Sequence, residues 1–546
     1  MQKNGKILFI FGIILLQLLF MGNFYFKHIF YAPMFESDAA SDVLLSKLLY
    51  DEGKWIYSDN WYYSTEAGLL NKIPFLGVLY HAIGDYQISY GFTRIIMVLF
   101  LCVSAAILLR TAGVSLKNIL VGALLLMIPY GSYRRYSTFS MLTGIDYYIY
   151  FAIFPFLFMA IWLCIRHKRF GKVGTGLLLV LEFLLSIIVG IVSIRFSFIL
   201  IAPVCMTECV ELWRKRMKGS ADDKSLPARW SILLLGVSCI CFAIGSYIQK
   251  HVIYEKYSVK DFSSVRFAGI DQIREQFWLV VDGILKAFGY NADGGVIVST
   301  IGVCQLLCLV YLVLVIILTI RLLRTGSGRI RYVTLFFVIQ FLTGVFVQLV
   351  TSAVDIGAVQ RYVWESMFGL IMVPALYLEQ LDQENQEQTD EKKLLMRKLV
   401  VIFSMAGVLL VNNLCLRFSY RPDSQEVDQY SSEVVKGNYR NATVDQRQGY
   451  IQFLKAAGLT FGYGEFWDAN ITTVLTNDEI TVCAVNDDEF LSYKRWSNRI
   501  DTENTDKYPP QFYLYTNGLE QARLERGWGV GNRVLYRDDY FVVYEP

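Results

Sequence analysis

The chain has 546 residues, of which 54% are hydrophobic and 15% aromatic, whereas only 18% are charged, against about 25% in ordinary soluble domains. Residues 420–546 hold 20 Asp+Glu against 13 Lys+Arg, and the remaining residues hold 28 against 38, so the two parts of the chain face different surroundings. The long apolar runs exclude a disordered, collagen-like or disulfide-scaffold protein and predict one large membrane-embedded body with an appendage.

Apolar stretches of helical length recur along the first 415 residues and predict about eleven transmembrane helices. The first stretch, 7–27, lacks a small-residue cleavage site, so we interpret it as a retained helix and not as a signal peptide. The predicted spans are residues 7–27, 92–110, 118–130, 146–165, 173–190, 197–213, 230–248, 297–320, 332–350, 363–380 and 396–415.

The basic residues predict how these spans are oriented. Alternate connections between them, together with the N-terminus, are rich in Lys and Arg, so they are expected to be cytoplasmic. The predicted architecture is a polytopic α-helical membrane domain, 1–415, with exoplasmic loops 28–91 and 249–296, and a C-terminal extracytoplasmic α+β domain, 416–546. The expected location is the cell (plasma) membrane.

Residues 28–91 are too patterned for a simple connector. Ser37 or Asp38 can cap a helix with a leucine stripe that ends at Gly53, and such a helix is expected to lie along the membrane surface. Aromatic residues follow, as is typical of the membrane interface. The apolar stretch Ile73–Ile83 carries Pro74 and is too short to cross the membrane, so it predicts a second juxtamembrane element.

The tail shows alternating helix and strand patterns. Residues 443–457 fit an amphipathic helix, and residues 537–539 fit a hairpin turn. The aromatic cluster 461–468 is interpreted as the start of a hydrophobic core, with sugar stacking as the alternative. The predicted strands are 480–485, 512–515, 534–536 and 540–544.

An acidic motif follows the first span. Glu36 and Asp38 are placed where the predicted outer membrane surface meets low-dielectric lipid, and burial raises the pKa of a carboxyl group into the range of a general base. The alternative is that Asp38 caps the helix and Glu36 is solvated. Four scattered histidines exclude a His-rich zinc cluster, so any metal is expected to be a hard cation such as Mg²⁺ or Mn²⁺, held by Asp38 and Glu36.

The order of these features resembles the GT-C superfamily of polyprenyl-phosphate-sugar-dependent membrane glycosyltransferases, which includes the aminoarabinose and protein O-mannosyl transferases. The chain departs from the family pattern in reading Glu-x-Asp where members often carry adjacent acids. The matching motifs are Glu36-Ser37-Asp38, Tyr63-Ser64-Thr65-Glu66, Gly84-Asp85, Arg94, Thr143-Gly144-Ile145-Asp146 and Arg361-Tyr362.

The resemblance implies a role for each acidic residue. Asp38 matches the catalytic acid, which would deprotonate the acceptor hydroxyl in an inverting transfer, and Glu36 is the reserve candidate. Glu66 and Asp146 match secondary acidic positions near the donor sugar. The alternative for Glu66 is a solvated surface residue, and the alternative for Asp146 is a helix N-cap. The implied enzyme is a hexosyl- or pentosyltransferase with a polyprenyl-phosphate sugar donor and an envelope glycan, lipid or protein acceptor.

A lipid-phosphate leaving group needs positive charge at the outer face. Four arginines stand against the positive-inside trend and are the candidates, Arg361 first because its Arg-Tyr context matches the family. For Arg134 and Arg135 the alternative is contact with lipid headgroups, and for Arg195 it is a structural pair with a carbonyl or carboxylate. Glu182, in the middle of a span, is either functional or hydrogen-bonded between helices.

Other classes of function stay open at this point. A transporter or lipid flippase needs broken helices and polar residues near the bilayer midplane, where only Glu182 fits. A non-catalytic envelope-assembly protein could use the same scaffold with its tail as a binding module, and an oligosaccharide polymerase or ligase would depend on outer-loop arginines and not on Asp38. No nucleic-acid partner is expected, because the basic residues mark loop ends and form no aromatic-basic platform.

Overall fold

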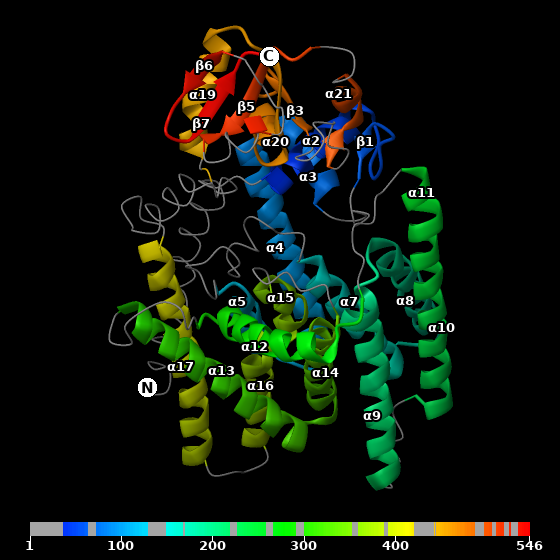
Figure 1. Ribbon diagram of the computed structural model, residues 1–546. Coiled ribbons are helices and arrows are strands. Elements are labelled where there is room, and N and C mark those ends of the chain that lie inside the picture. The colour runs from blue at the N-terminus through cyan, green and yellow to red at the C-terminus, as the bar shows by residue number, and fades with distance from the viewer. Residues whose placement is uncertain are drawn as a thin grey trace.

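The computed structural model describes fifteen stretches of the chain, in which a body of helices carries a small β-sheet at one end (Figure 1). All structural statements below concern these residues. They are 37–63, 72–128, 149–167, 170–218, 226–257, 266–290, 300–351, 359–386, 391–419, 442, 444–485, 496–504, 509–517, 524–525 and 533–546.

The body consists of helices from the middle of the chain, and α12 lies across the direction of α9, α10 and α17 (Figure 1). Its helices are α4 (Tyr86–Thr111), α5 (Leu116–Leu126), α7 (Tyr150–Arg166), α8 (Lys172–Val192), η2 (Ser197–Ile201), α9 (Ala202–Lys218), α10 (Ala228–Ile248), η3 (Gln249–Ile253), α11 (Tyr254–Lys256), α12 (Ile270–Ala287), α13 (Thr300–Thr325), α14 (Gly328–Val350), α15 (Val359–Ile371), α16 (Val373–Gln386) and α17 (Glu391–Ser419).

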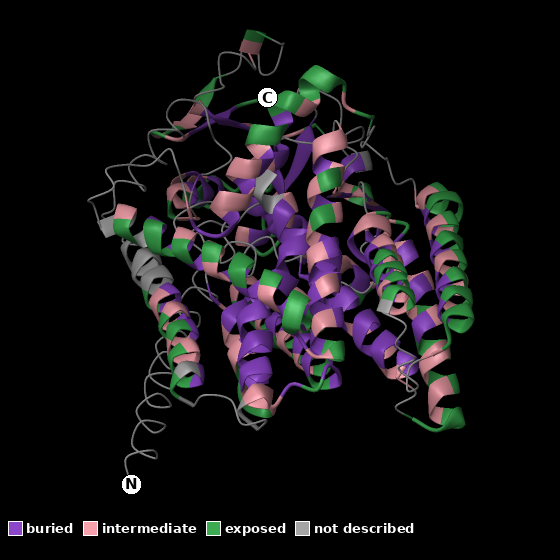
Figure 2. Ribbon diagram, turned by 90° about the horizontal axis from the view of Figure 1, so that it is seen from below, coloured by how far each residue is buried: buried purple, intermediate pink, exposed green. Residues whose placement is uncertain are grey.

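Five helical stretches in the described part of the chain are long and apolar enough to cross a membrane. Buried residues gather in the centre of the body, and exposed residues follow the outward faces of its peripheral helices (Figure 2). Many of these outward residues are large and apolar, such as Leu99 and Val103 on α4, which are 55% and 53% exposed. An apolar outer surface on apolar helices is the surface of a multi-pass membrane protein. The five stretches are 86–111, 172–192, 228–256, 305–325 and 328–350.

The structure departs from the predicted spans at three places. Residues 363–380 form two helices, α15 and α16, with a break at Met372. The predicted span 197–213 begins with the π-helix η2, a form that inserts an extra residue into a turn. The expected loop 249–296 contains the end of the long α10–α11 helix and the separate amphipathic helix α12.

Helices α8 and α10 pack closely through glycines. A Cβ atom on Gly190 or Gly245 would collide with the backbone of the facing helix, so only glycine permits this approach. Within this contact Glu182 is fully buried, and Ser238 Oγ donates a hydrogen bond of 3.0 Å to Glu182 Oε1. The geometry therefore agrees with the interpretation of Glu182 as a carboxyl group hydrogen-bonded between helices.

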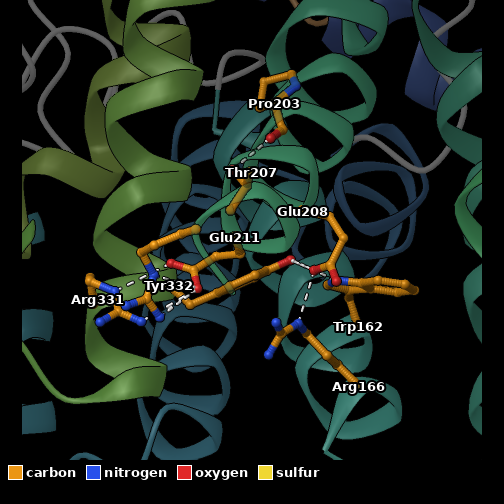
Figure 3. Close-up of polar contacts among 9 residues, drawn as sticks. Trp162, Arg166, Pro203, Thr207, Glu208, Glu211, Arg331 and Tyr332 are labelled. Atoms are coloured by element: carbon orange, nitrogen blue, oxygen red, sulfur yellow. Dashed lines mark hydrogen bonds and ion pairs between the residues drawn. The ribbon is translucent and has the colours of Figure 1, made fainter. Parts of the chain in front are cut away.

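A buried polar cluster joins α7, α9 and α14 (Figure 3). The Arg166 Nε and Tyr332 hydroxyl groups both donate to Glu208 Oε2, at 2.9 and 2.7 Å, and Trp162 Nε1 donates to the Tyr332 oxygen at 2.8 Å. One turn along α9, Glu211 pairs with arginines of α9 and α14. Because every group in the Glu208 cluster has a partner inside the protein, the cluster serves to connect the three helices.

Residues 442–546, here called the C-terminal region, contain a five-stranded sheet. Its strand order is β3-β2-β5-β7-β6, with β2 parallel to β3 and β5 and with β7 antiparallel to β5 and β6. Two helices, α19 and α20, share one face of the sheet. The elements are α19 (Val444–Ala456), β2 (Phe461–Glu465), α20 (Phe466–Leu475), β3 (Thr481–Val485), β4 (Ser497–Asn498), α21 (Arg499–Asn504), β5 (Phe512–Thr516), β6 (Val534–Arg537) and β7 (Phe541–Tyr544).

Between the body and the C-terminal region lie α2 (Ser37–Asp51), β1 (Trp61–Tyr62) and α3 (Ile73–Ile83). As predicted, α2 ends just before Gly53, which has the left-handed φ of 65° that glycine tolerates. Trp61, one of the aromatic residues that follow α2, is only 2% exposed and packs against the leucines of α2, while β1 pairs with β4 of the C-terminal region.

Candidate functional site

Two carboxylates share one face of α2. The segment Ser37-Asp38-Ala39-Ala40-Ser41-Asp42 repeats Ser-Asp with a period of four, and residues four apart lie above one another on a helix. The repeat therefore produces one stripe of serines and, beside it, one stripe of aspartates. Asp38 lies in the first turn of α2, where the helix dipole favours negative charge.

Two buried cations lie close to the aspartate stripe. Lys72 Nζ is 3.0 Å from Asp42 Oδ2 and donates a 2.6 Å hydrogen bond to the Tyr90 hydroxyl. Arg94, one turn further along α4, lies 4.3 Å from the centroid of the Tyr90 ring. Lys72 and Arg94 are only 3% and 2% exposed, whereas the Asp42 side chain is 26% exposed. Solvent therefore reaches this cluster on its acidic side.

The C-terminal region holds the serine stripe. Ser37 Oγ donates to the Phe466 carbonyl at 2.6 Å, and Asn470 Nδ2 donates to Ser41 Oγ at 2.7 Å and to the Trp496 carbonyl at 2.9 Å. Apolar side chains of α20 pack with Ala39 and Ala40 around these bonds. Since α20 also covers the sheet, the orientation of the aspartate stripe depends on contacts with residues more than 400 positions away.

The predicted site residues fall into two groups. Glu36, Glu66, Asp146, Arg134 and Arg135 lie outside the described residues. Arg361 lies on α15, but the position of its side chain is outside the described part of the structure.

Arg195 is described, and it pairs with a carboxylate. Its Nη1 atom is 2.6 Å from Glu365 Oε1, and its guanidinium lies 5.5 Å from the centroid of the Tyr362 ring. Glu365 is almost fully buried, so removing Arg195 would leave that charge without this partner. The contact corresponds to the structural alternative considered for Arg195, and we leave this residue out of the proposed site.

Sequence reasoning did not assign roles to Asp42, Lys72 or Arg94. A signal for Arg94 was present, because an arginine within a long apolar helix is costly unless the protein uses it. A signal for Lys72 was also present, since it precedes an apolar segment on the predicted outer side, against the positive-inside trend. Neither signal indicates that both side chains meet Tyr90.

The described carboxylates do not form a ligand set for a divalent cation. In the part of the chain that the structure describes, no three His, Cys, Asp or Glu side chains gather as metal ligands do. Of the two aspartates on α2, Asp42 already pairs with Lys72. Mg²⁺ and Mn²⁺ prefer several oxygen ligands, so these residues alone do not suit either ion. The other predicted ligand, Glu36, lies outside the described residues.

The loop after α2 contains a well-connected carboxylate. Glu52 Oε1 accepts hydrogen bonds from Ser58 Oγ at 2.9 Å and Asn60 Nδ2 at 2.7 Å, and Oε2 is 3.1 Å from Lys54 Nζ. Burial alone would raise the pKa of Glu52, but these hydrogen bonds and the Lys54 charge together lower it below the usual 4.5. The bonds stabilise the turn that leads from α2 into β1.

Comparison with solved structures identifies the fold. ArnT from Cupriavidus metallidurans in the apo state aligns over 100% of this chain and 98% of its own, with a TM-score of 0.54 and 10% identity. ArnT bound to undecaprenyl phosphate aligns over 98% of each chain, with a TM-score of 0.53 and 9% identity. The Archaeoglobus fulgidus oligosaccharyltransferase aligns over 94% of this chain and 69% of its own, with a TM-score of 0.47 and 11% identity.

The chain thus has the fold of ArnT, and the similarity extends over its whole length. No protein-family model matches the sequence. No curated protein matches it in sequence either. At 10% identity the likeness establishes the fold, and the activity has to be argued from the site.

Proposed function

We propose that this chain is an integral membrane glycosyltransferase that moves a sugar from a polyprenyl-phosphate donor to an acceptor in the cell envelope, on the exoplasmic side. The observation that carries the proposal is the aspartate stripe of α2, with Asp42 open to solvent, beside two buried cations in a GT-C fold. ArnT has been crystallised with undecaprenyl phosphate, which supports a lipid-phosphate donor for a chain of the same fold.

In the proposed reaction Asp38 is the general base. It takes the proton of the acceptor hydroxyl while that oxygen attacks the anomeric carbon of the donor sugar. The new bond joins the acceptor oxygen to the anomeric carbon, and the bond from that carbon to the phosphate oxygen breaks. Its electron pair leaves with the polyprenyl phosphate. Because the acceptor oxygen attacks from the face opposite the phosphate in a single displacement, the configuration at the anomeric carbon inverts.

The leaving phosphate gains negative charge, and fixed cations in a water-poor site stabilise such charge strongly. Lys72 and Arg94 are suited to this task because burial keeps them in place, and the Tyr90 ring holds both within 5 Å of its centroid, at 4.7 and 4.3 Å. Arg361, Arg134 and Arg135 stay in the proposal as further phosphate ligands, and Glu66 and Asp146 as acids near the donor sugar.

Sugar transfer by the purified protein tests the proposal. The protein in nanodiscs is supplied with a panel of polyprenyl-phosphate sugars and an envelope extract, and wild type is compared with Asp38→Asn. We expect turnover in the wild type and a loss of about 10²–10⁴-fold in the variant, the usual contribution of a general base.

Asp445→Asn is the matched control, because Asp445 also lies in the first turn of a helix but is exposed and belongs to α19. Its turnover should equal that of the wild type. Full transfer by Asp38→Asn at equal folded yield would refute the assignment of Asp38 as the base. If the wild type transfers no sugar from any donor of the panel, the result counts against the enzyme class.

Dependence on a divalent cation is a separate hypothesis that concerns Asp38 and Glu36. Treatment with EDTA, followed by return of Mg²⁺ or Mn²⁺, tests it on an active preparation. Loss of turnover with EDTA and recovery with the ion supports the hypothesis, and unchanged turnover contradicts it.

A further inference from the structure

A second feature lies at the other end of α2. Between the C-terminal half of α2 and α3 there is a cleft of about 190 Å³. The residues that form it include Lys47, Tyr50, Asp51, Gly77, Tyr80 and His81. None of them belongs to the aspartate stripe, and the proposed reaction uses none of them.

The cleft has an aromatic wall. The rings of Tyr50 and His81 stack with their centroids 4.0 Å apart and an angle of 24° between their planes. The pair is open to solvent, since Tyr50 is 40% exposed and His81 is also exposed. Tyr80 adds a third ring to the lining. Exposed stacked rings present flat apolar faces, which suit the C–H faces of a sugar ring.

Two polar groups of the cleft, on Tyr80 and Lys47, contact one turn of the C-terminal region. Tyr80 donates from its hydroxyl to Asn477 Oδ1 at 2.7 Å, and Lys47 forms an ion pair with Asp478. Asn477 and Asp478 have left-handed backbone angles, with φ of 54° and 62°. Asn and Asp adopt this conformation more readily than other residues with a side chain, so the turn is well suited to present two adjacent polar side chains.

The close approach of α2 and α3 shapes the floor of the cleft. A Cβ atom at Gly77 would lie 2.7 Å from the Ser46 carbonyl oxygen, so glycine is required for the two helices to come this near. The aromatic pair then lies beside the charged side chains of Lys47 and Asp51. Apolar ring faces next to a few hydrogen-bonding groups form the surface that recognises a carbohydrate.

We propose that this cleft binds a saccharide unit of the acceptor, at a distance from the reacting hydroxyl. Tyr50 lies twelve residues after Asp38 on the same helix, which corresponds to about 18 Å. An acceptor that reaches both positions is longer than one sugar, so the acceptor is an oligosaccharide or polysaccharide chain. The role as acceptor subsite rests on the proposed glycosyltransferase function, whereas saccharide binding by the cleft does not.

Binding can be measured without turnover. The full chain in nanodiscs carries Asp38→Asn, and maltotriose, chitotriose, mannotriose and galactotriose are the probes in saturation-transfer-difference NMR and calorimetry. We expect at least one trisaccharide to bind, and binding to weaken about tenfold or more in Tyr50→Ala and His81→Ala. Tyr50→Phe keeps the ring and should bind nearly as the parent does.

Tyr247→Ala is the matched control, because Tyr247 and His251 form a second Tyr-His pair, with ring centroids 4.6 Å apart, on α10 and η3. This variant should bind as the parent does. Binding that is absent for every probe, or equal in Tyr50→Ala and the control, overturns the proposal. Ring-dependent binding, together with no sugar transfer by the wild-type chain, supports the cleft and counts against the glycosyltransferase function, so the two failures are distinguishable.

Discussion

Two polar clusters of this protein are built from the same kinds of residue. Among the helices of the body, the Arg166 guanidinium lies 4.6 Å from the centroid of the Tyr332 ring, and the carboxylate of Glu208 binds both groups. Beside α2, an arginine lies over the buried Tyr90 ring in the same way, and the partner of the carboxylate is Lys72. The residue types alone do not distinguish a structural cluster from a functional one.

The two clusters differ in access. The side chain of Glu208 is 2% exposed, and its partners enclose it. The side chain of Asp42 is 26% exposed, and Asp38 lies beside it on the same helix face. A carboxylate that solvent reaches can exchange a proton with a ligand, whereas an enclosed one contributes to helix packing. The opening on one side, and not the composition, therefore makes the second cluster a candidate site.

The largest expected effect on stability is at the enclosed cluster. Glu208→Gln leaves Arg166 charged and buried without its counter-ion, which costs about 3–5 kcal/mol. The midpoint of thermal unfolding in detergent should fall and the folded yield should drop. Glu255→Gln is the control, since Glu255 is 71% exposed and its loss should cost less than about 0.5 kcal/mol. Equal midpoints for the two variants would show that the cluster does not connect the helices.

At the open cluster we expect activity to fall more than stability. Lys72→Met removes a buried cation beside the aspartates, and turnover should fall about 10²–10³-fold, as on loss of one stabilising donor at a developing anion. Asp42 regains water when its partner is lost, so the thermal midpoint should change less than in Glu208→Gln. Unchanged turnover in Lys72→Met together with a large fall in its thermal midpoint would show that both clusters are structural.

The link between the C-terminal region and α2 should matter to turnover as well as to stability. Asn470→Ala removes both of its hydrogen bonds to Ser41 and the Trp496 carbonyl, at a cost of about 1–2 kcal/mol, and we expect kcat to fall because the aspartate stripe loses its support.

Asn517→Ala is the matched control for this positioning role. Asn517 Nδ2 also bonds a backbone carbonyl, that of Asp538, but it lies at the end of β5 and away from α2. A similar loss of stability with unchanged kcat is expected. If both variants lower kcat equally, Asn470 acts through general stability and not through α2.

The smallest expected effect is a pH dependence at the turn after α2. The folded state lowers the pKa of Glu52 below 4.5, so its contribution to stability is present above that pH and is lost as the pH falls through the folded-state pKa. Glu52→Gln should lower the thermal midpoint near neutral pH by an amount that corresponds to about 1 kcal/mol or less, and the difference from wild type should shrink in acid. A difference in thermal midpoint that grows as the pH falls would contradict a lowered pKa of Glu52 in the folded state.

Local pattern sufficed for much of the architecture. Apolar runs predicted the membrane body, and the glycine after the leucine stripe predicted the end of α2. The residue pattern predicted strands at 480–485 and 540–544, which the structure has as Thr481–Val485 and Phe541–Tyr544. These features depend on residues close in sequence, through helical and strand periodicity. The prediction of one continuous span over residues 363–380 missed the break at Met372. A local signal was present, because Pro374 lies in the first turn of α16, and proline cannot donate the hydrogen bond that would continue the preceding helix.

The sequence by itself determined that this protein is a membrane protein with an acidic motif at Asp38, because composition and residue order need no contacts. The predicted first span, 7–27, lies outside the described residues and stays a prediction. Only the tertiary structure decided which groups surround that motif. Lys72 meets Asp42 across 30 positions, and Asn470 meets Ser41 across 429. Such pairs depend on how helices pack and on which side chain faces which neighbour, and the aromatic cleft between α2 and α3 exists for the same reason.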